Sequence, residues 1–528
     1  MTSALPAVAR GEGSPTLEAF RVTQNLANTA VPAVADIAVV EVSDSVLCEH
    51  TALSGVCEGI GFRRAAFRGV RHPGCAYRIG EACSVPSGTP YRRSLRDLRP
   101  RIVSPVPAQA RWLARDPVRT AVMRENGVHS LMVVPLAVNR VVLGFVAFYR
   151  RGGSSPFRQA DLRAAASLAG RTAQILDVVR RDVQEQGMGR RFQQALLAPP
   201  PHLTAIEEVS GHVPENGTPG GWFDVIRLPS ARVGLVAGFC GGHGITAATA
   251  MSQQKARIRA LAVLSQDPAE VLTRGLEPPA DEPDAQDQPS LAGHCVYAVY
   301  DPVTRRCTAA HTSQARLTMV DADGAQSVGA SAQEPESSAT CNVTEFDVPP
   351  GSVLALSSPS PQELHHTVPG GQPRSDQTDP ETGPRQPAAT PVVTLTAQTR
   401  ATAPTDIATW DLSNEPSVVA EARARAAAQV TSWGLPDLSF TVTLVVSELV
   451  TNAIRYSTGP IQLRLIRDHV LICEVADTSR AAPHAGEPAP SEQGGRGLSI
   501  VNHLTQGYGT RYTPSGKIVW TELSLYQS

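Results

Sequence analysis

The sequence predicts a multidomain α+β protein, because its length, its mixed periodicities and one break in composition indicate separate folded parts. At 528 residues the chain is too long for one hydrophobic core, and about three domains are expected. Helical periodicity is clear at 441–457, and strand-like apolar runs flank a turn at 138–140. Residues 364–404 are rich in Pro, Thr, Gln, Ser and Gly and are predicted to form a flexible linker.

Charge and composition narrow the class of protein. The chain has 47 basic and 49 acidic residues, so neither nucleic acid nor an acidic membrane surface is expected as a partner. No run of about 18 apolar residues and no signal-peptide pattern occur, which favours a soluble cytoplasmic protein. The nine cysteines show no C-x-x-C spacing and are interpreted as reduced thiols in ordinary packing. An alternative redox or metal site would use Cys48, Cys57, Cys75 and Cys83.

The first predicted domain covers residues 15–186. A helix is expected at 16–29, a strand at 37–47, an antiparallel hairpin around 138–140 and a long exit helix at 157–186. This order, with the phrase GFVAFYR closing the hairpin, resembles a GAF sensory domain. The resemblance implies binding of a small molecule or dimerisation. The exit helix either forms a coiled coil in a homodimer or packs on its own domain, and both alternatives stay open.

The second predicted domain covers residues 188–363. RFQQALL, GGWFDV, RVGLVAG and GGHG occur in this order between positions 191 and 244. Together they resemble a PPM-type serine phosphatase of the stage II sporulation protein E (SpoIIE) class, which implies an α-β-β-α sandwich. Enzymes of this class use aspartates to hold two divalent cations that activate a water molecule.

The acidic residues that this resemblance requires are mostly missing. Gly221 is followed directly by Trp222 where the family pattern has an intervening aspartate, and Phe239 takes the place of a second aspartate. The sequence at 358–360 is Ser-Pro-Ser where the family pattern has T-D-G. Asp224 alone cannot bind two hard cations, because each needs several oxygen ligands. We therefore expect a pseudophosphatase, and keep a working Mg²⁺/Mn²⁺-dependent phosphatase with unusual ligands as an alternative.

The third predicted domain, residues 405–528, contains the chemically most informative helix, at 441–457. Its apolar face is formed by Val442, Val445, Val446, Leu449 and Ala453. Glu448 and Asn452 stand one turn apart on another face, so both side chains can reach one small volume. A carboxylate there can accept a proton or orient a nucleophile. An amide oxygen can help to hold a divalent cation beside phosphates.

Two later segments supply the other parts of a nucleotide site. A predicted strand ends at Asp477, in the sequence VADTS. A glycine-rich loop at 494–498 opens a helix, and backbone amides at such a helix start can bind phosphate. The order E-x-x-x-N, then D-x-S-x-x-x-P, then G-R-G-L resembles the N, G1 and G2 boxes of the GHKL (Bergerat) ATP-binding fold. The wording SELVTNAIRYS is similar to that of RsbW-like anti-sigma-factor serine kinases of the HATPase class.

This resemblance implies ATP and Mg²⁺ as cofactors and a layer of helices on a mixed sheet. Glu448 would be the general base toward the substrate serine, Asn452 would bind Mg²⁺, and Asp477 would accept a hydrogen bond from the adenine amino group. The implied cofactor-binding residues are Asn452, Asp477, Gly495, Arg496, Gly497 and Leu498. Residues 481–493 would form a mobile lid.

The combined expectation is a cytoplasmic regulator in a sigma-factor partner-switching system. The first domain would receive a signal, the second would be non-catalytic, and the third would phosphorylate an anti-sigma-factor antagonist on serine. A sigma factor or the antagonist would be its protein partner. The alternatives are an active PPM-type protein serine/threonine phosphatase and an ATP-binding scaffold that transfers no phosphate.

Overall fold

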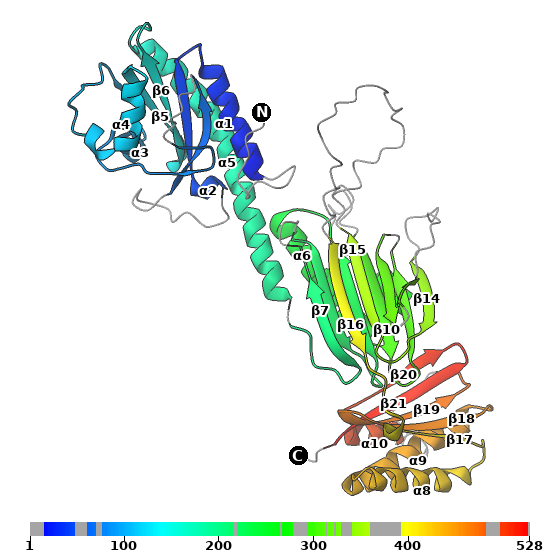
Figure 1. The fold of residues 1–528 in the computed structure, drawn as a ribbon. Helices are drawn as coiled ribbons and strands as arrows, with labels where there is room; N and C mark the ends of the chain where they lie inside the picture. The colour runs from blue at the N-terminus through cyan, green and yellow to red at the C-terminus, as the bar shows by residue number, and fades with distance from the viewer. Residues whose placement is uncertain are drawn as a thin grey trace, which may run out of the picture. The chain divides into compact units, whose positions relative to one another are not determined.

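The computed structural model (Figure 1) divides the chain into two compact units, Met1–Phe192 and Gln193–Ser528, and each is described by itself. The structure describes residues 15–525 except for these segments: 48–60, 70–76, 198, 215–218, 265–266, 278–292, 313, 322–323, 329–340, 360–391 and 482–496. Cys48, Cys57, Cys75, Gly495 and Arg496 lie outside the described residues, as does almost all of the predicted lid.

The first unit is built on a six-stranded sheet of order β3-β2-β1-β6-β5-β4. The strands are β1 (Ile37–Ser43), β2 (Phe62–Arg68), β3 (Ala82–Cys83), β4 (Arg101–Val103), β5 (Val128–Val138) and β6 (Val141–Arg151). The helices are α1 (Pro15–Ala30), α2 (Asp44–Leu47), α3 (Pro90–Asp97), α4 (Pro117–Glu125) and α5 (Gln159–Leu196), and a short 3₁₀ turn spans Leu113–Arg115. The strand predicted at 37–47 ends at Ser43, where the short helix α2 begins.

Successive side chains of β1 point alternately into the two hydrophobic cores of this unit, one on each face of the sheet. Ala38 and Val40 share a core with α1 and α5, whereas Val39 shares the other core with α3 and α4. The predicted hairpin is confirmed: β5 pairs antiparallel with β6, and Asn139 and Arg140 have the positive φ angles of 49° and 66° that suit a two-residue hairpin turn.

The exit helix α5 is longer than predicted, since it continues to Leu196. Its buried residues, including Ala165, Ala169, Ala173 and Leu176, lie in the same core as α1 and one face of the sheet. This part of the helix therefore packs on its own domain, which is one of the two alternatives that the sequence left open.

The middle part of the second unit contains two five-stranded sheets packed face to face. Their orders are β14-β11-β10-β9-β8 and β13-β12-β15-β16-β7. The strands of the first sheet are β8 (Gly221–Arg227), β9 (Val233–Phe239), β10 (His294–Asp301), β11 (Arg306–His311) and β14 (Asn342–Asp347). Those of the second are β7 (Ile206–His212), β12 (Arg316–Asp321), β13 (Gly324–Val328), β15 (Val353–Pro359) and β16 (Val392–Thr399).

Two helices cover the outer face of the first of these sheets. They are α6 (Gly244–Val263) and α7 (Pro268–Leu276). Ile258 of α6 and Leu272 of α7 share a core with Trp222 and Tyr297 of the sheet. A separate core, which includes Leu235 and Leu395, lies between the two sheets.

Strand β16 corrects the predicted linker at 364–404. Its residues alternate between half-buried and buried, and Val393, Leu395 and Ala397 lie in the core between the sheets. β16 pairs with β15 on one side and β7 on the other, so it belongs to the folded middle domain. The prediction was wrong here because the many Thr residues hid the two-residue periodicity of a strand.

The C-terminal part is one layer of helices on a five-stranded sheet of order β17-β18-β19-β21-β20. The strands are β17 (Ile407–Leu412), β18 (Ile461–Arg467), β19 (Val470–Asp477), β20 (Gly507–Thr513) and β21 (Gly516–Ser524). The helices are α8 (Val418–Ser432), α9 (Ser439–Tyr456) and α10 (Gly497–Leu504), and short 3₁₀ turns span Pro404–Asp406 and Pro436–Leu438. All described strand pairs are antiparallel, so the predicted mixed sheet is corrected.

The segment Pro436–Tyr456, which includes α9, has the length and apolar composition of a membrane-spanning helix. Its apolar residues Val442, Val445, Val446 and Leu449 lie in the core that α9 shares with α8 and the sheet. Their burial accounts for the composition of this helix, because the core helix of a domain carries the same residues.

Candidate nucleotide site and altered phosphatase site

Helix α9 positions the two side chains that the sequence singled out. Because Val445 and Leu449 anchor it to the sheet, the adjoining face of the helix holds Glu448 and Asn452 one turn apart. Both residues are half-buried, and neither side chain hydrogen-bonds to another described residue. A carboxylate and an amide thus remain available to a ligand beside this helix.

Asp477 ends strand β19 close to the C-terminal end of α9. The hydroxyl groups of Thr478 and Ser457 lie 2.9 Å apart, and Ser457 directly follows α9. The Ser457 carbonyl also accepts a hydrogen bond of 2.7 Å from Nδ2 of Asn414. These contacts fix the end of β19 against the end of the helix that bears Glu448 and Asn452.

The third predicted motif leads into helix α10, which begins at Gly497. Val501 of α10 is fully buried in the core that contains α9, so the helix packs on α9. Gly497 and Leu498 form the first residues of α10, whereas Gly495 and Arg496 lie outside the described part of the chain. The structure therefore packs α10 on the helix that carries Glu448 and Asn452.

One residue of this region was missed by sequence reasoning. Lys517 of β21 donates a hydrogen bond of 3.0 Å from Nζ to Oδ1 of Asp477, and both side chains are almost fully buried. The signal was present in the composition, because Lys517 is one of only two lysines in an arginine-rich chain. The pairing of β19 with β21 places Lys517 opposite Asp477, and the sequence alone does not show this pairing.

The middle domain places Asp224 in a set of ion pairs. Oδ2 of Asp224 lies 3.0 Å from Nε of Arg259, and Oδ1 lies 3.7 Å from Nζ of Lys255. Lys255 also donates to the carbonyl groups of Leu196 and Phe223. The one acidic residue that remains from the expected metal set is thus neutralised by two basic side chains.

The other positions expected to carry metal-binding aspartates are apolar or buried. Phe239 lies in the core between the sheets. Pro359, which takes the place of the aspartate in the T-D-G pattern, is the last residue of β15 and has no side-chain oxygen. The preceding Ser358 is buried, and its hydroxyl donates to the His294 carbonyl. Within the described residues there is no group of three or more His, Cys, Asp or Glu side chains that could hold a metal ion. The described residues therefore do not fit the two-cation centre of the phosphatase class.

A buried hydrogen-bond network lies beside these positions. Trp222 Nε1 donates to Oε1 of Gln254 at 3.1 Å, and Cys240 Sγ donates to the same oxygen at 2.9 Å. Burial raises the pKa of Cys240 to about 12, so its thiol stays protonated and can donate. Strand β8 and the residue that follows β9 are therefore joined to α6 by neutral hydrogen bonds.

The glycine-rich turn before α6 has a backbone conformation that suits glycine. Gly242 and Gly244 have φ angles of 104° and 52°, which only glycine adopts readily. His243, which lies between these glycines, is the N-cap residue of α6 but makes no capping hydrogen bond through its side chain.

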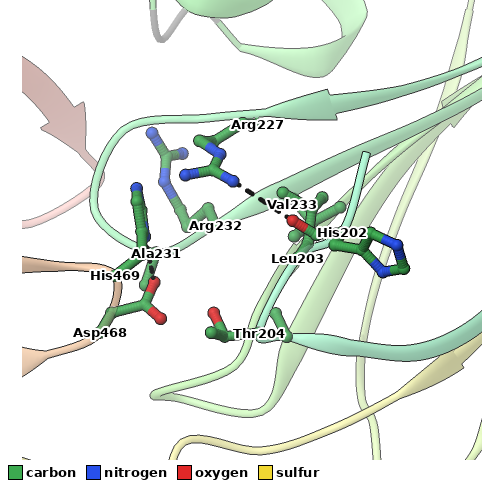
Figure 2. A pocket seen from close by; sticks show the side chains of 10 residues that line it. His202, Leu203, Thr204, Arg227, Ala231, Arg232, Val233, Asp468 and His469 are labelled. Carbon is green, nitrogen blue, oxygen red and sulfur yellow. Dashed lines mark hydrogen bonds and ion pairs between the residues drawn. The ribbon is translucent and has the colours of Figure 1, made fainter. Parts of the chain in front are cut away.

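Within the second unit, the middle and C-terminal domains meet on the sheet face opposite α8 and α9. Ala231 and Val303 pack against Ile466, Val470 and Ile472, which alternate with the strand residues that face the helices. Figure 2 shows a small cleft at this contact, with Arg227 and Arg232 on one side and Asp468 and His469 on the other. This contact leaves the face of α9 that bears Glu448 and Asn452 uncovered.

The contact also contains charged groups. The backbone N–H of Ser230 donates to Oε1 of Glu522 at 3.3 Å, and Arg511 bridges Glu474 and Asp301 at 3.3 and 3.9 Å. Burial, and then the positive charge of Arg511, lower the pKa of Arg232 to about 10.

The first unit holds a buried ionic cluster under α3 and α4. The carboxylate of Glu41 accepts hydrogen bonds from Arg64 at 3.0 Å and from Arg119 at 2.6 Å. The Arg119 guanidinium also lies 5.2 Å from the ring centre of Tyr77 and 5.1 Å from that of Tyr91. This part of the interior is therefore filled by the protein's own side chains.

Three family models match the chain. The GAF domain model matches residues 31–176, the Stage II sporulation protein E (SpoIIE) model matches 229–359, and the histidine kinase-like ATPase domain model matches 412–522. The SpoIIE match begins after the segment that contains Trp222 and Asp224. The chain thus combines a GAF domain, a SpoIIE-type phosphatase domain and a histidine kinase-like ATPase domain, as the sequence predicted.

The solved structures to which parts of this chain are similar include the RsbU and RsbW domains of Rv1364c from Mycobacterium tuberculosis. That structure has 16% identity and a TM-score of 0.29, and the match covers 61% of this chain and 97% of the other. A GAF domain region from Geobacter sulfurreducens PCA has 19% identity and a TM-score of 0.24, with coverage of 31% and 96%. The S. agalactiae serine/threonine phosphatase has 8% identity and a TM-score of 0.24, with coverage of 29% and 78%. No curated protein matches the chain.

Proposed function

We propose that this protein is a cytoplasmic signalling regulator of a sigma-factor partner-switching system. Its C-terminal domain binds Mg-ATP and phosphorylates a serine of an anti-sigma-factor antagonist. The observation that carries this proposal is the arrangement around α9. This helix bears two half-buried polar side chains, Glu448 and Asn452, its C-terminal end contacts the end of β19, and α10 packs on it.

Each residue has a role that its chemistry allows. The Glu448 carboxylate accepts the proton of the attacking serine, and Asn452 supplies an oxygen to Mg²⁺ beside the phosphates. Gly495, Arg496, Gly497 and Leu498 would bind the phosphates, to which backbone amide groups of a glycine-rich helix start are suited. Asp477 accepts a hydrogen bond from the adenine amino group. When bound, Mg²⁺ neutralises charge on the transferred phosphate.

The middle domain acts without catalysis in this proposal. Support comes from the ion pairs of Asp224 with Arg259 and Lys255 and from the apolar residue at position 239. The domain then serves as a folded connection that carries the C-terminal domain on its β8–β9 and β10–β11 turns, through Ala231 and Val303. The GAF domain would provide the input, by a small-molecule ligand or by dimerisation.

Equilibrium binding of Mg-ATP to the full-length chain tests the proposal. Calorimetry should detect one nucleotide site, and Asn452→Ala should weaken binding about tenfold or more in the presence of Mg²⁺, because a metal ligand is lost. Thr451→Ala, an exposed neighbour on the same helix, is the matched control and should bind as the wild type does. Unchanged affinity in Asn452→Ala would refute the role of this residue, and absence of binding by the wild type would refute the proposed function.

A further inference from the structure

The pairing of β19 with β21 places Lys517 directly opposite Asp477. The two residues are Cα partners in the antiparallel ladder. The preceding residue, Gly516, has a φ angle of +153°, and a Cβ atom there would lie 2.0 Å from the Asp477 carbonyl oxygen. The glycine thus allows the two strands to approach closely, which brings the lysine and aspartate side chains together.

The described hydrogen bonds of this pair leave one carboxylate oxygen of Asp477 and one N–H donor of Lys517 available to a ligand. Oδ1 of Asp477 accepts from Lys517 Nζ at 3.0 Å and from the Ser479 backbone N–H at 2.7 Å. Lys517 Nζ donates a second bond, of 3.4 Å, to the Ser479 carbonyl. An ammonium group has three donors, so one remains beyond the described contacts. No described residue donates to Oδ2 of Asp477.

A buried ion pair is weak evidence for stability, because the cost of removing two charges from water offsets much of their attraction. Lys517 is 3% exposed and Asp477 is 2% exposed at the side chain. Such a pair is well suited to reading a ligand, since it holds a hydrogen-bond donor and an acceptor side by side in a region shielded from water.

We propose that Lys517 is a second residue that reads the nucleotide base and determines its identity together with Asp477. This inference rests on the proposed function, in which Asp477 accepts from the amino group of adenine. Adenine presents that donor next to an acceptor, the ring nitrogen N1. The free donor of Lys517 Nζ bonds N1 while Oδ2 of Asp477 accepts from the amino group.

The pair also excludes guanine. In guanine the group beside N1 is an acceptor, the carbonyl oxygen O6, and N1 itself carries a hydrogen. A guanine in the same orientation would place O6 against the aspartate and N1–H against the lysine. Two acceptors would then meet at the aspartate and two donors at the lysine. These buried polar groups would be left without hydrogen-bond partners.

Two base analogues test the role of Lys517 in the full-length wild-type chain. 1-Deaza-ATP lacks the N1 acceptor, and 7-deaza-ATP is a control altered at a different ring position. We expect 1-deaza-ATP to bind about tenfold to a hundredfold more weakly than ATP, as is typical for the loss of a hydrogen bond to a charged group. We expect 7-deaza-ATP to bind as ATP does. This comparison needs no substitution, so it holds even if a variant fails to fold.

Two substitutions test whether the Lys517 side chain causes the preference for ATP over 1-deaza-ATP. Lys517→Met keeps the length of the chain without the donor, and it should bind ATP and 1-deaza-ATP equally. Lys517→Arg keeps a donor and should restore part of the preference for ATP. If the wild type binds ATP and 1-deaza-ATP equally, or if Lys517→Met binds ATP more tightly than the wild type, the inference is wrong while the proposed function stands. If the wild type binds no nucleotide, both fail.

Discussion

Asp224 lies in an ion pair with Arg259, with 3.0 Å between Oδ2 and Nε. Lys255 stands on the other side of the carboxylate, 3.7 Å from Oδ1. In the phosphatase class that the middle domain resembles, carboxylates hold cations. In this chain the surviving carboxylate faces two basic side chains, which would repel a cation brought to the same place.

The first prediction concerns metal binding by this domain. We expect the nucleotide-free full-length chain to show no tight binding of Mn²⁺ at Asp224, because Arg259 and Lys255 already neutralise its charge. Electron paramagnetic resonance of added Mn²⁺ measures the free ion directly. Asp224→Asn should give the same titration as the wild type. Two tightly bound ions per chain that disappear in Asp224→Asn would support the active-phosphatase alternative instead.

The second prediction separates binding from phosphoryl transfer. Glu448→Gln should bind Mg-ATP as the wild type does but transfer the γ-phosphate to an anti-sigma-factor antagonist about a hundredfold or more slowly, because the general base is lost. Transfer from radiolabelled ATP measures the rate. Glu421→Gln, on the exposed side of α8, is the matched control. An unchanged rate in Glu448→Gln would remove this residue from the mechanism, and absence of transfer to every antagonist would favour the scaffold alternative.

The third prediction concerns the buried network of the middle domain. Gln254→Leu should lower the free energy of unfolding by about 1–3 kcal/mol, because Trp222 and Cys240 lose their shared acceptor. Gln253→Leu makes the same chemical change at the adjacent exposed position of α6 and should have little effect. Urea denaturation followed by tryptophan fluorescence measures both variants. Equal free energies of unfolding for Gln254→Leu and Gln253→Leu would show that the hydrogen-bond network does not stabilise the fold.

The fourth prediction concerns alkaline pH. Burial raises the pKa of Cys240 and of Cys473 to about 12, from a usual value of 9.0. Below about pH 9 both thiols are protonated in the folded and unfolded chains, and their contribution to stability is fully present. Between about pH 9 and 12 only the unfolded chain loses these protons, so stability falls as pH rises.

At one pH unit above 9, each thiol should lower the free energy of unfolding by about 1.4 kcal/mol relative to its value at neutral pH. Urea denaturation at neutral pH and at about pH 10 measures the change. The double variant Cys240→Ala and Cys473→Ala should show a smaller loss over the same interval, whatever its stability at neutral pH. An identical pH dependence in this variant would contradict the assignment to these thiols.

The elements that the sequence predicted well are those whose signal is local. The β5–β6 hairpin follows from two apolar runs and the Asn139-Arg140 turn, and α9 follows from its own apolar stripe. The helix α9 also carries Glu448 and Asn452, so this part of the candidate site could be predicted from spacing alone.

The features that sequence reasoning missed depend on partners far along the chain. β16 is defined by pairing with β15 and with β7, which lies nearly at the start of the second unit. β20 and the antiparallel order of the last sheet likewise depend on pairing with β21. The contact of Lys517 with Asp477 likewise depends on the register of β21 against β19, which places the two residues opposite each other. Periodicity reports which face of an element is buried, but it does not report which strand lies beside it.

The position of β16 has a consequence for dividing this protein into fragments. A protease cut within 364–391 would divide the chain into two polypeptides. The C-terminal polypeptide would still contribute β16, an interior strand, to a sheet whose other strands all belong to the N-terminal polypeptide. The halves should therefore copurify after cleavage. Shortening the C-terminal piece so that it begins after Thr399 removes that inserted strand, and the pieces should then come apart more readily.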